Sequence, residues 1–254
     1  PKRGGSCNAR MVVFQSTAIA ENWVLFAPRA KNRLNLSLVT VERKTVFGLD
    51  PSRVGQLWRA LHRLAQPGRQ WVSFNFLTKD EVACLTKLAE RQSFRSARPE
   101  ISYKSNRVFQ DFDICFPAPR IDAFDQFAHC LEKGLFQAGQ MMTPSPFSTY
   151  FWFDDFAIQR YPPGSRGIGI HRDGLRYWHI VVIATLAGKS RLFSTPSRDG
   201  EKRRVIDDRP GRIVLLSAPA FAGRTGDAAR PLHGVDHVQG GRLSLGLRVE
   251  CPGK

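Results

Sequence analysis

Residues 242–249 read Arg242-Leu-Ser-Leu-Gly-Leu-Arg-Val, and this stretch decides the fold class. Its three leucines alternate with Arg242, Ser244, Gly246 and Arg248. Because successive side chains of a β-strand point to opposite faces, the alternation predicts a strand with one leucine face and one arginine-bearing face. Two interpretations of the second face are open. Its guanidinium groups hold a dicarboxylate, with which they pair bidentately, or they lie in solvent at a sheet edge.

The sequence before this strand has the same texture, with short β-like runs between Gly- and Pro-containing turns. Several short strands at this spacing predict a β-sandwich or barrel. The expected strands in this half are 151–160, 168–171, 179–186, 190–194, 212–217 and 242–249.

The first half of the chain predicts helices more than strands. Apolar residues at helical spacing predict helices over 51–64, 78–90 and 121–135, and the second begins with a capping box from Thr78 to Glu81. An alternating run predicts a strand over 107–116, and short β-like runs occupy 11–14, 23–26 and 36–41. Helices first and strands later predict an α+β protein: a double-stranded β-helix, or jelly roll, braced by N-terminal helices.

The charge balance is the least ordinary feature of the composition. In 254 residues, 38 Lys+Arg face 22 Asp+Glu, which gives a formal net charge of +16. Residues 160–248 alone carry 16 Lys+Arg and 7 Asp+Glu. Such a field attracts polyanions, and nucleic acid is the first candidate partner. A basic surface that only favours solubility is the plainer interpretation, since charge says nothing about chemistry.

The remaining composition excludes several classes. Hydrophobic residues at 42% and charged residues at 24% exclude a wholly disordered chain. Five scattered cysteines without CxxC spacing argue against a disulfide framework or structural zinc, and favour an intracellular, reducing compartment, cytoplasmic or nuclear. No apolar run approaches the ~20 residues of a membrane helix, so no membrane association is expected.

His171-Arg-Asp173 is the sole His-x-Asp in the sequence. Residues two apart on a strand project to the same face, so one imidazole and one carboxylate can reach a common ion. A third ligand must come from a distant strand, and His179, His233 and His237 are available. Two histidines and one carboxylate leave positions open on Fe(II) for a co-substrate and O2. Taken alone, the tripeptide is more often a surface turn.

The metal pattern and the arginine strand support each other. His233 precedes Arg242 by nine residues, across a Gly-containing turn, so both can enter one pocket. His233 is preferred over His237 because its His-Gly-Val context and its spacing to Arg242 both fit, and His179 is expected to pack beside Trp178. A protein-kinase catalytic loop is excluded, because it requires Asn where Trp178 stands, and no Asp-Phe-Gly or Gly-rich loop is present.

The segment from about 156 to 249 resembles the Fe(II)/2-oxoglutarate dioxygenase superfamily, and most of all its AlkB-type branch. The resemblance lies in Ile158-Gln-Arg-Tyr161-Pro-Pro-Gly164, the following Ile170-His-Arg-Asp173, His233-Gly-Val235, and the strand from Arg242 to Arg248. It implies a single catalytic domain over 1–254, in which 1–150 supplies N-terminal strands and supporting helices and 151–254 is the jelly-roll core that binds iron and 2-oxoglutarate.

The resemblance also implies the site residues. Iron would be bound by His171, Asp173 and His233, and 2-oxoglutarate by Tyr161, Arg242, Ser244, Arg248 and Gln159, with no catalytic side chain beyond the metal ligands. The co-substrates 2-oxoglutarate and O2 would yield succinate and CO2 as a substrate is hydroxylated or demethylated. Gln159 stands where that branch usually has Asn, and Arg-x-Ser is also typical of oxygenases that act on small molecules.

The substrate is therefore the least constrained expectation. Basic charge and aromatic residues near the site (Tyr177, Trp178, Phe153) favour DNA, RNA or a nucleobase stacked in a pocket, although such aromatics also pack in cores. Hydroxylation of a small molecule or a protein side chain is the first alternative. A basic nucleic-acid-binding domain without catalysis is the second.

Overall fold

Two long antiparallel strands, β8 (Tyr177–Thr195) and β11 (Leu232–Glu250), form the centre of the fold and pair along most of their length. The computed structural model describes residues 46–103 and 106–251, within one compact unit that spans Lys44–Lys254. Both strands bend at glycines with positive φ: Gly188 at 87° and Gly241 at 90°. A Cβ on Gly188 would lie 2.0 Å from the carbonyl oxygen of Gly241, so this corner requires glycine.

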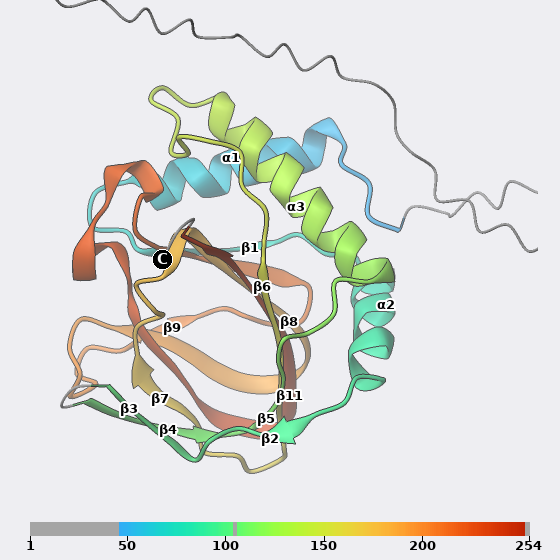
Figure 1. Ribbon diagram of the computed structural model, residues 1–254, viewed down its shortest axis with the longest axis vertical. Coiled ribbons are helices and arrows are strands. Elements are labelled where there is room, and N and C mark those ends of the chain that lie inside the picture. Colours follow the sequence, from blue (N-terminus) through green and yellow to red (C-terminus); the bar gives the residue numbers. More distant parts are fainter. Residues whose placement is uncertain (1–45, 104–105, 252–254) are drawn as a thin grey trace, which may run out of the picture. The chain divides into compact units, whose positions relative to one another are not determined.

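The bend divides β8 and β11 between two layers (Figure 1). The first half of β8 and the second half of β11 pair with β10 and β6, whereas the other halves pair with β9 and β7. The sheet extends through β1 at one edge and through β5 and β2 at the other, and β4 joins β7 to β3. The other strands are β1 (Trp71–Asn75), β2 (Arg95–Ser96), β3 (Glu100–Tyr103), β4 (Asn106–Asp111), β5 (Asp113–Cys115), β6 (Asp155–Tyr161), β7 (Gly167–His171), β9 (Arg204–Ile206) and β10 (Arg212–Ser217).

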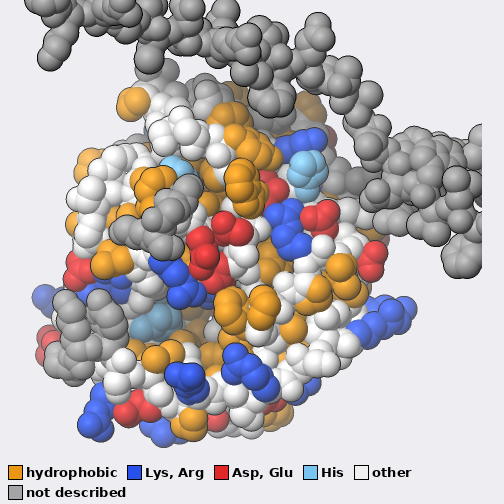
Figure 2. Space-filling view, in the orientation of Figure 1, with side chains coloured by type: hydrophobic (Ala, Val, Ile, Leu, Met, Phe, Trp, Pro, Cys, Tyr) orange, Lys and Arg blue, Asp and Glu red, His pale blue; other side chains and the backbone are white. Residues whose placement is uncertain are grey.

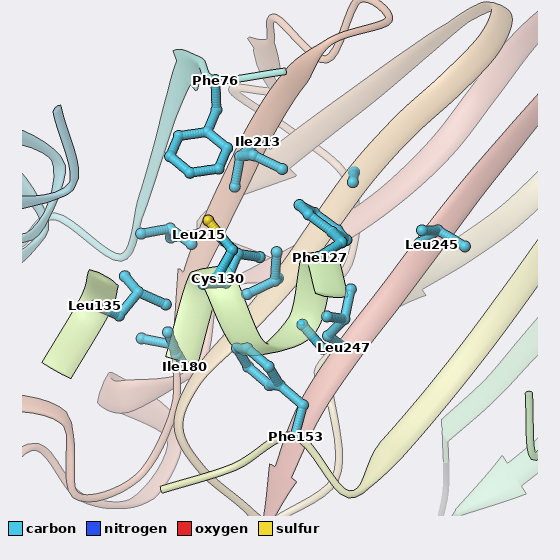
Figure 3. Close-up of a cluster of buried hydrophobic side chains, with 14 of the residues drawn as sticks. Phe76, Phe127, Cys130, Leu135, Phe153, Ile180, Ile213, Leu215, Leu245 and Leu247 are labelled. Carbon is cyan, nitrogen blue, oxygen red and sulfur yellow. The ribbon is translucent and has the colours of Figure 1, made fainter. Parts of the chain in front are cut away.

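Three helices cover the outer face of the first layer: α1 (Pro51–Ala65), α2 (Lys79–Glu90) and α3 (Asp122–Gln140). Their apolar faces join the leucine face of β11 in one large core. Figure 3 shows α3 side chains against residues of β8, β10 and β11. Asp50 caps α1, and Thr78 and Glu81 form the expected capping box of α2. The Arg53–Glu81 ion pair, at 2.7 Å, joins the two helix starts.

A second, smaller core lies between the two layers. Its members come from both, with Val181 and Val214 from the first and Leu192 and Val235 from the second. This shared core shows that the layers pack face to face, as in a jelly roll. The expected fold class, a double-stranded β-helix braced by helices, is therefore confirmed.

The structure corrects several expected element bounds. The strand expected over 107–116 is broken at Phe112 into β4 and β5, and the third helix runs five residues further, to Gln140. The strands expected over 179–186 and 190–194 are one strand, because Gly188 bends β8 without ending it. Strands β1, β2, β3 and β9 were not expected. The runs 11–14, 23–26 and 36–41 lie outside the described residues. Among the described residues, no helix is long and apolar enough to cross a membrane.

Candidate metal centre

His171, Asp173 and His233 come together beside the second, smaller core, in a cavity that members of this core also line. His171 is the last residue of β7, Asp173 follows it in the turn to β8, and His233 is the second residue of β11. The pairing of β7 with β11 sets His233 opposite His171, next to a register shift. The strand register thus brings together His171 and His233, which are 62 positions apart in the sequence.

The three side chains offer ligand atoms that all lie within 4.8 Å of one another, and no other such group of His, Cys, Asp or Glu occurs in the described part of the chain. His233 Nε2 is 3.7 Å from Asp173 Oδ2, and the two imidazole centroids are 4.3 Å apart. The alternative ligand His237 is exposed and pairs with Asp236, and His179 packs beside Trp178 as expected.

Backbone carbonyls fix both imidazole rings. His171 Nδ1 is 2.9 Å from the carbonyl oxygen of Gly169, and His233 Nδ1 is 3.2 Å from that of Pro231. An Nδ1–H that donates to a carbonyl leaves the Nε2 lone pair free for a metal, which is the usual second-sphere arrangement of histidine ligands.

The electrostatics keep His171 and Asp173 in their ligating forms. Burial lowers the pKa of His171 to about 4, and the neighbouring His233 acts in the same direction, so the ring is neutral near pH 7. Burial alone would raise the pKa of Asp173, but His233, Arg248 and His171 together hold it below its ordinary value. A neutral imidazole and an ionised carboxylate are what a divalent ion requires.

Arg248 lies beside the metal ligands, and Asp155 holds its guanidinium. Its NH1 donates to Asp155 Oδ1 at 3.0 Å, and its Nε is 3.5 Å from Asp173 Oδ1 without a hydrogen-bond partner. Asp155 is almost fully buried and also accepts from Tyr177 and Arg176. Since Asp155 faces Arg248 in the β6–β11 register, the carboxylate positions this guanidinium.

Arg242 lies at the other end of the same cavity and is fully engaged with the protein. Its guanidinium is about 1% exposed and pairs with Asp208 at 3.0 Å. It also donates to the hydroxyls of Thr185 and Ser244, and its charge lies over the ring of Tyr161. The buried cation is therefore compensated before any ligand arrives.

Seven of the eight residues expected in the site line one cavity, and the eighth, Ser244, bonds to Arg242. Tyr161 and Gln159 lie side by side there, with the phenol OH 3.4 Å from Gln159 Oε1, and burial raises the pKa of Tyr161 to about 12. The seven expected site residues that line the cavity are Gln159, Tyr161, His171, Asp173, His233, Arg242 and Arg248.

The aromatic residues expected near the substrate have other roles. Phe153 and Trp178 pack in the core between the helices and the sheet, and Tyr177 is buried against Asp155. Sequence reasoning missed Asp155, Asp208 and the role of Thr185. No motif marks them, because each acts through a strand pairing or loop contact that only the fold creates.

The donor set fits a non-haem Fe(II). Two imidazoles and one carboxylate meet within 4.8 Å, and Tyr161, Arg242 and Arg248 line the same cavity. Two histidines and one carboxylate are the donor set that holds Fe(II) in non-haem oxygenases, where it would leave positions open for a co-substrate and O2. The buried Arg248 Nε without a partner is a donor aimed at this same end of the cavity.

Comparisons with known proteins support the fold. No family model and no curated protein matches the chain. A prolyl-4-hydroxylase from Pseudomonas putida is similar in structure, with a TM-score of 0.55 and 18% identity over 77% of this chain and all of the other. A 2OG-Fe(II) oxygenase family oxidoreductase from Burkholderia pseudomallei has a TM-score of 0.50 and 14% identity, covering 80% of this chain and 93% of the other. A prolyl hydroxylase from Trichoplax adhaerens, solved with a hypoxia inducible factor peptide, has a TM-score of 0.51 and 14% identity, covering 79% and 93%.

At these identities the likeness is one of fold. The chain has the double-stranded β-helix found in 2OG-Fe(II) oxygenases, and it carries the His171, Asp173 and His233 triad inside that fold.

Proposed function

We propose that this chain is an Fe(II)- and 2-oxoglutarate-dependent dioxygenase that hydroxylates or demethylates its substrate, with release of succinate and CO2. The observation that carries the proposal is the triad: three metal-ligating side chains from three segments meet within 4.8 Å in a fold used by such enzymes. When bound, iron and 2-oxoglutarate would activate O2, the oxidant that no protein side chain can replace.

The cavity supplies what a dicarboxylic co-substrate needs. Arg248 offers an unpartnered Nε–H at the metal end, which suits the carboxylate nearest the metal. At the other end, Arg242, Ser244 and Tyr161 suit the far carboxylate, and Gln159 supports the Tyr161 hydroxyl. Because Asp208 already pairs with Arg242, the far carboxylate would be held by directed donors more than by net charge.

Apolar side chains from both layers complete the cavity wall and limit access of water to the reacting centre. Val181 and Ile183 belong to the first half of β8, and Leu192 and Val235 belong to the second layer. Exclusion of water strengthens the electrostatic contacts of Arg248 and Asp173 and protects a strongly oxidising site from side reactions.

For the substrate, we propose nucleic acid or a nucleobase, as in the AlkB-type branch. The support is the net charge of +16 and the likeness of the 158–173 and 242–248 segments to that branch. Figure 2 shows basic side chains spread over the visible face among acidic and apolar ones, without one continuous stripe. Charge alone therefore does not mark the binding path.

Succinate formation with Fe(II) and 2-oxoglutarate tests the proposal. We expect turnover that methylated oligonucleotides stimulate, with affinity that falls steeply as salt rises. Acidic small molecules and peptides serve as the comparison substrates. If only an acidic small molecule or a peptide stimulates succinate formation, and salt does not affect this, the nucleic-acid substrate would be wrong and that compound would take its place. If no condition gives iron-dependent succinate formation, the enzyme assignment would be overturned.

A further inference from the structure

Three arginines outside the cavity lining gather beside the metal centre. Arg172 lies between the metal ligands His171 and Asp173 in sequence, Arg230 comes just before β11, and Arg198 belongs to the loop between β8 and β9. We call Arg172, Arg198 and Arg230 the arginine cluster.

The cluster is joined directly to the metal centre. Arg230 NH1 donates to the backbone carbonyl of Asp173 at 2.6 Å, and Arg172 Nε donates to the backbone carbonyl of Arg230 at 3.1 Å. Both side chains are largely buried, with 11% of Arg230 and 21% of Arg172 exposed. The guanidinium groups are thus fixed before a ligand arrives, and a ligand on them lies next to a metal ligand.

Within residues 46–103 and 106–251, the only carboxylate that forms an ion pair with the cluster is that of Asp227. Asp227 is shared by Arg172, at 3.4 Å, and Arg230, and it is 66% exposed. Arg198 is exposed and has no ion-pair partner among the described residues. Burial lowers the pKa of Arg172, and repulsion from Arg198 and Arg230 adds to this against the attraction of Asp227.

Arg230 also carries a donor with no use inside the protein. Its Nε is buried and has no hydrogen-bond partner among the described residues, although almost all buried polar groups in proteins have one. An unpaired, buried guanidinium N–H next to two other arginines is a preformed site for an oxyanion.

We propose that the arginine cluster binds a phosphate group of the substrate, an inference that rests on the proposed function of the adjacent metal centre. Guanidinium groups match phosphate geometry, and several of them can share the oxygens of one phosphate. A phosphate held there orients the attached nucleotide toward the metal end of the cavity. The strongly basic chain favours a nucleic-acid strand as the source of the phosphate over a free nucleotide.

Binding of a fluorescent single-stranded oligonucleotide, followed by anisotropy without iron or 2-oxoglutarate, tests the cluster separately from catalysis. Arg198 is the residue to change, since it is exposed and unpaired, so that Arg198→Ala and Arg198→Glu both retain the fold. We expect Arg198→Glu to weaken binding about tenfold and to lower the salt slope by about one or more. Competition by a nucleoside 5′-monophosphate, but not by the nucleoside, would identify phosphate as the recognised group.

Arg91→Glu is the matched control, because Arg91 directly follows α2, is exposed and has no ion-pair partner among the described residues. Helix α2 lies across the barrel from β7 and β9 in Figure 1. Equal affinities and salt slopes for the Arg198→Glu and Arg91→Glu proteins would overturn the proposal, as would equal competition by polyglutamate. Since binding is measured without iron, such a result leaves the proposed enzyme activity standing. If binding depends on Arg198 but the parent protein forms no succinate, the arginine cluster would stand as a phosphate site and the proposed enzyme activity would fall.

Discussion

The cavity has two ends that differ in how their charges are compensated. At the far end, Arg242 is paired with Asp208 and bonded to Thr185 and Ser244. At the metal end, Arg248 is held through Asp155, and its Nε–H lies in an ion pair with Asp173 at 3.5 Å but makes no hydrogen bond within the described residues. The far end is complete as folded, whereas the metal end retains donors and lone pairs that the protein does not use.

This difference separates structure from chemistry within one cavity. A buried charge that has its full set of partners stabilises a specific arrangement, and removal of one partner is costly. Groups without partners cost stability and persist where a ligand satisfies them. We therefore expect changes at the metal end to affect activity first, and changes at the far end to affect activity and stability together.

The largest expected effect is at the metal end. Asp173→Ala removes the only carboxylate of the triad, and we expect iron binding and succinate formation to fall more than about 100-fold, because even second-sphere changes at metal sites cost about 10–100-fold. The far-ultraviolet circular dichroism and Tm should remain close to those of the parent. Iron content and turnover measure the effect, and full activity in this variant would remove Asp173 from the site.

Arg242→Ala should combine two losses. The requirement for 2-oxoglutarate should rise strongly, and the free energy of unfolding should fall by about 3–5 kcal/mol because Asp208 is left buried without its partner. The double variant Arg242→Ala with Asp208→Asn should recover stability in urea unfolding but not the KM for 2-oxoglutarate. A normal KM in the double variant would assign the co-substrate anchor to Arg248.

Asp155→Asn tests the support of Arg248. The amide keeps the size of the side chain but loses the charge shared by Arg248, Arg176 and Tyr177. We expect kcat/KM for 2-oxoglutarate to fall about tenfold, with a stability loss of about 2 kcal/mol, because a hydrogen bond to a charged group is worth about 1.5–3 kcal/mol. Iron content should be retained. An unchanged kcat/KM with the same loss of stability would make Asp155 purely structural.

The smallest effect is expected far from the cavity. Thr78→Ala removes the side-chain half of the α2 capping box, which should cost about 1 kcal/mol. The KM for 2-oxoglutarate should be unchanged. If this variant alters the KM as much as Asp155→Asn does, general destabilisation would explain both, and the contrast between the two ends would be lost.

Local pattern predicted the parts of the molecule that depend on local chemistry. The alternation of 242–249, the His-x-Asp tripeptide and the Thr78 capping box each carry their information within a few residues. Asp155 and Asp208 could not be predicted, since their roles depend on the β6–β11 register and on a loop folded against β8 and β11. The continuity of β8 was missed because Gly188 resembles a turn residue in sequence.

The corner at Gly188 and Gly241 gives the site a fixed length. Arg242 pairs with Gly188 at this corner, and His233 lies on the same strand before it. The backbones approach so closely here that Gly188 has no room for a Cβ beside the Gly241 carbonyl, and the pairing of Gly188 with Arg242 fixes the register of the two strands at the corner. The backbone therefore sets the spacing between the metal ligands and the Arg242 guanidinium. The bent strand β11 thus fixes the length of the co-substrate, with an acidic group at each end, that the site can hold.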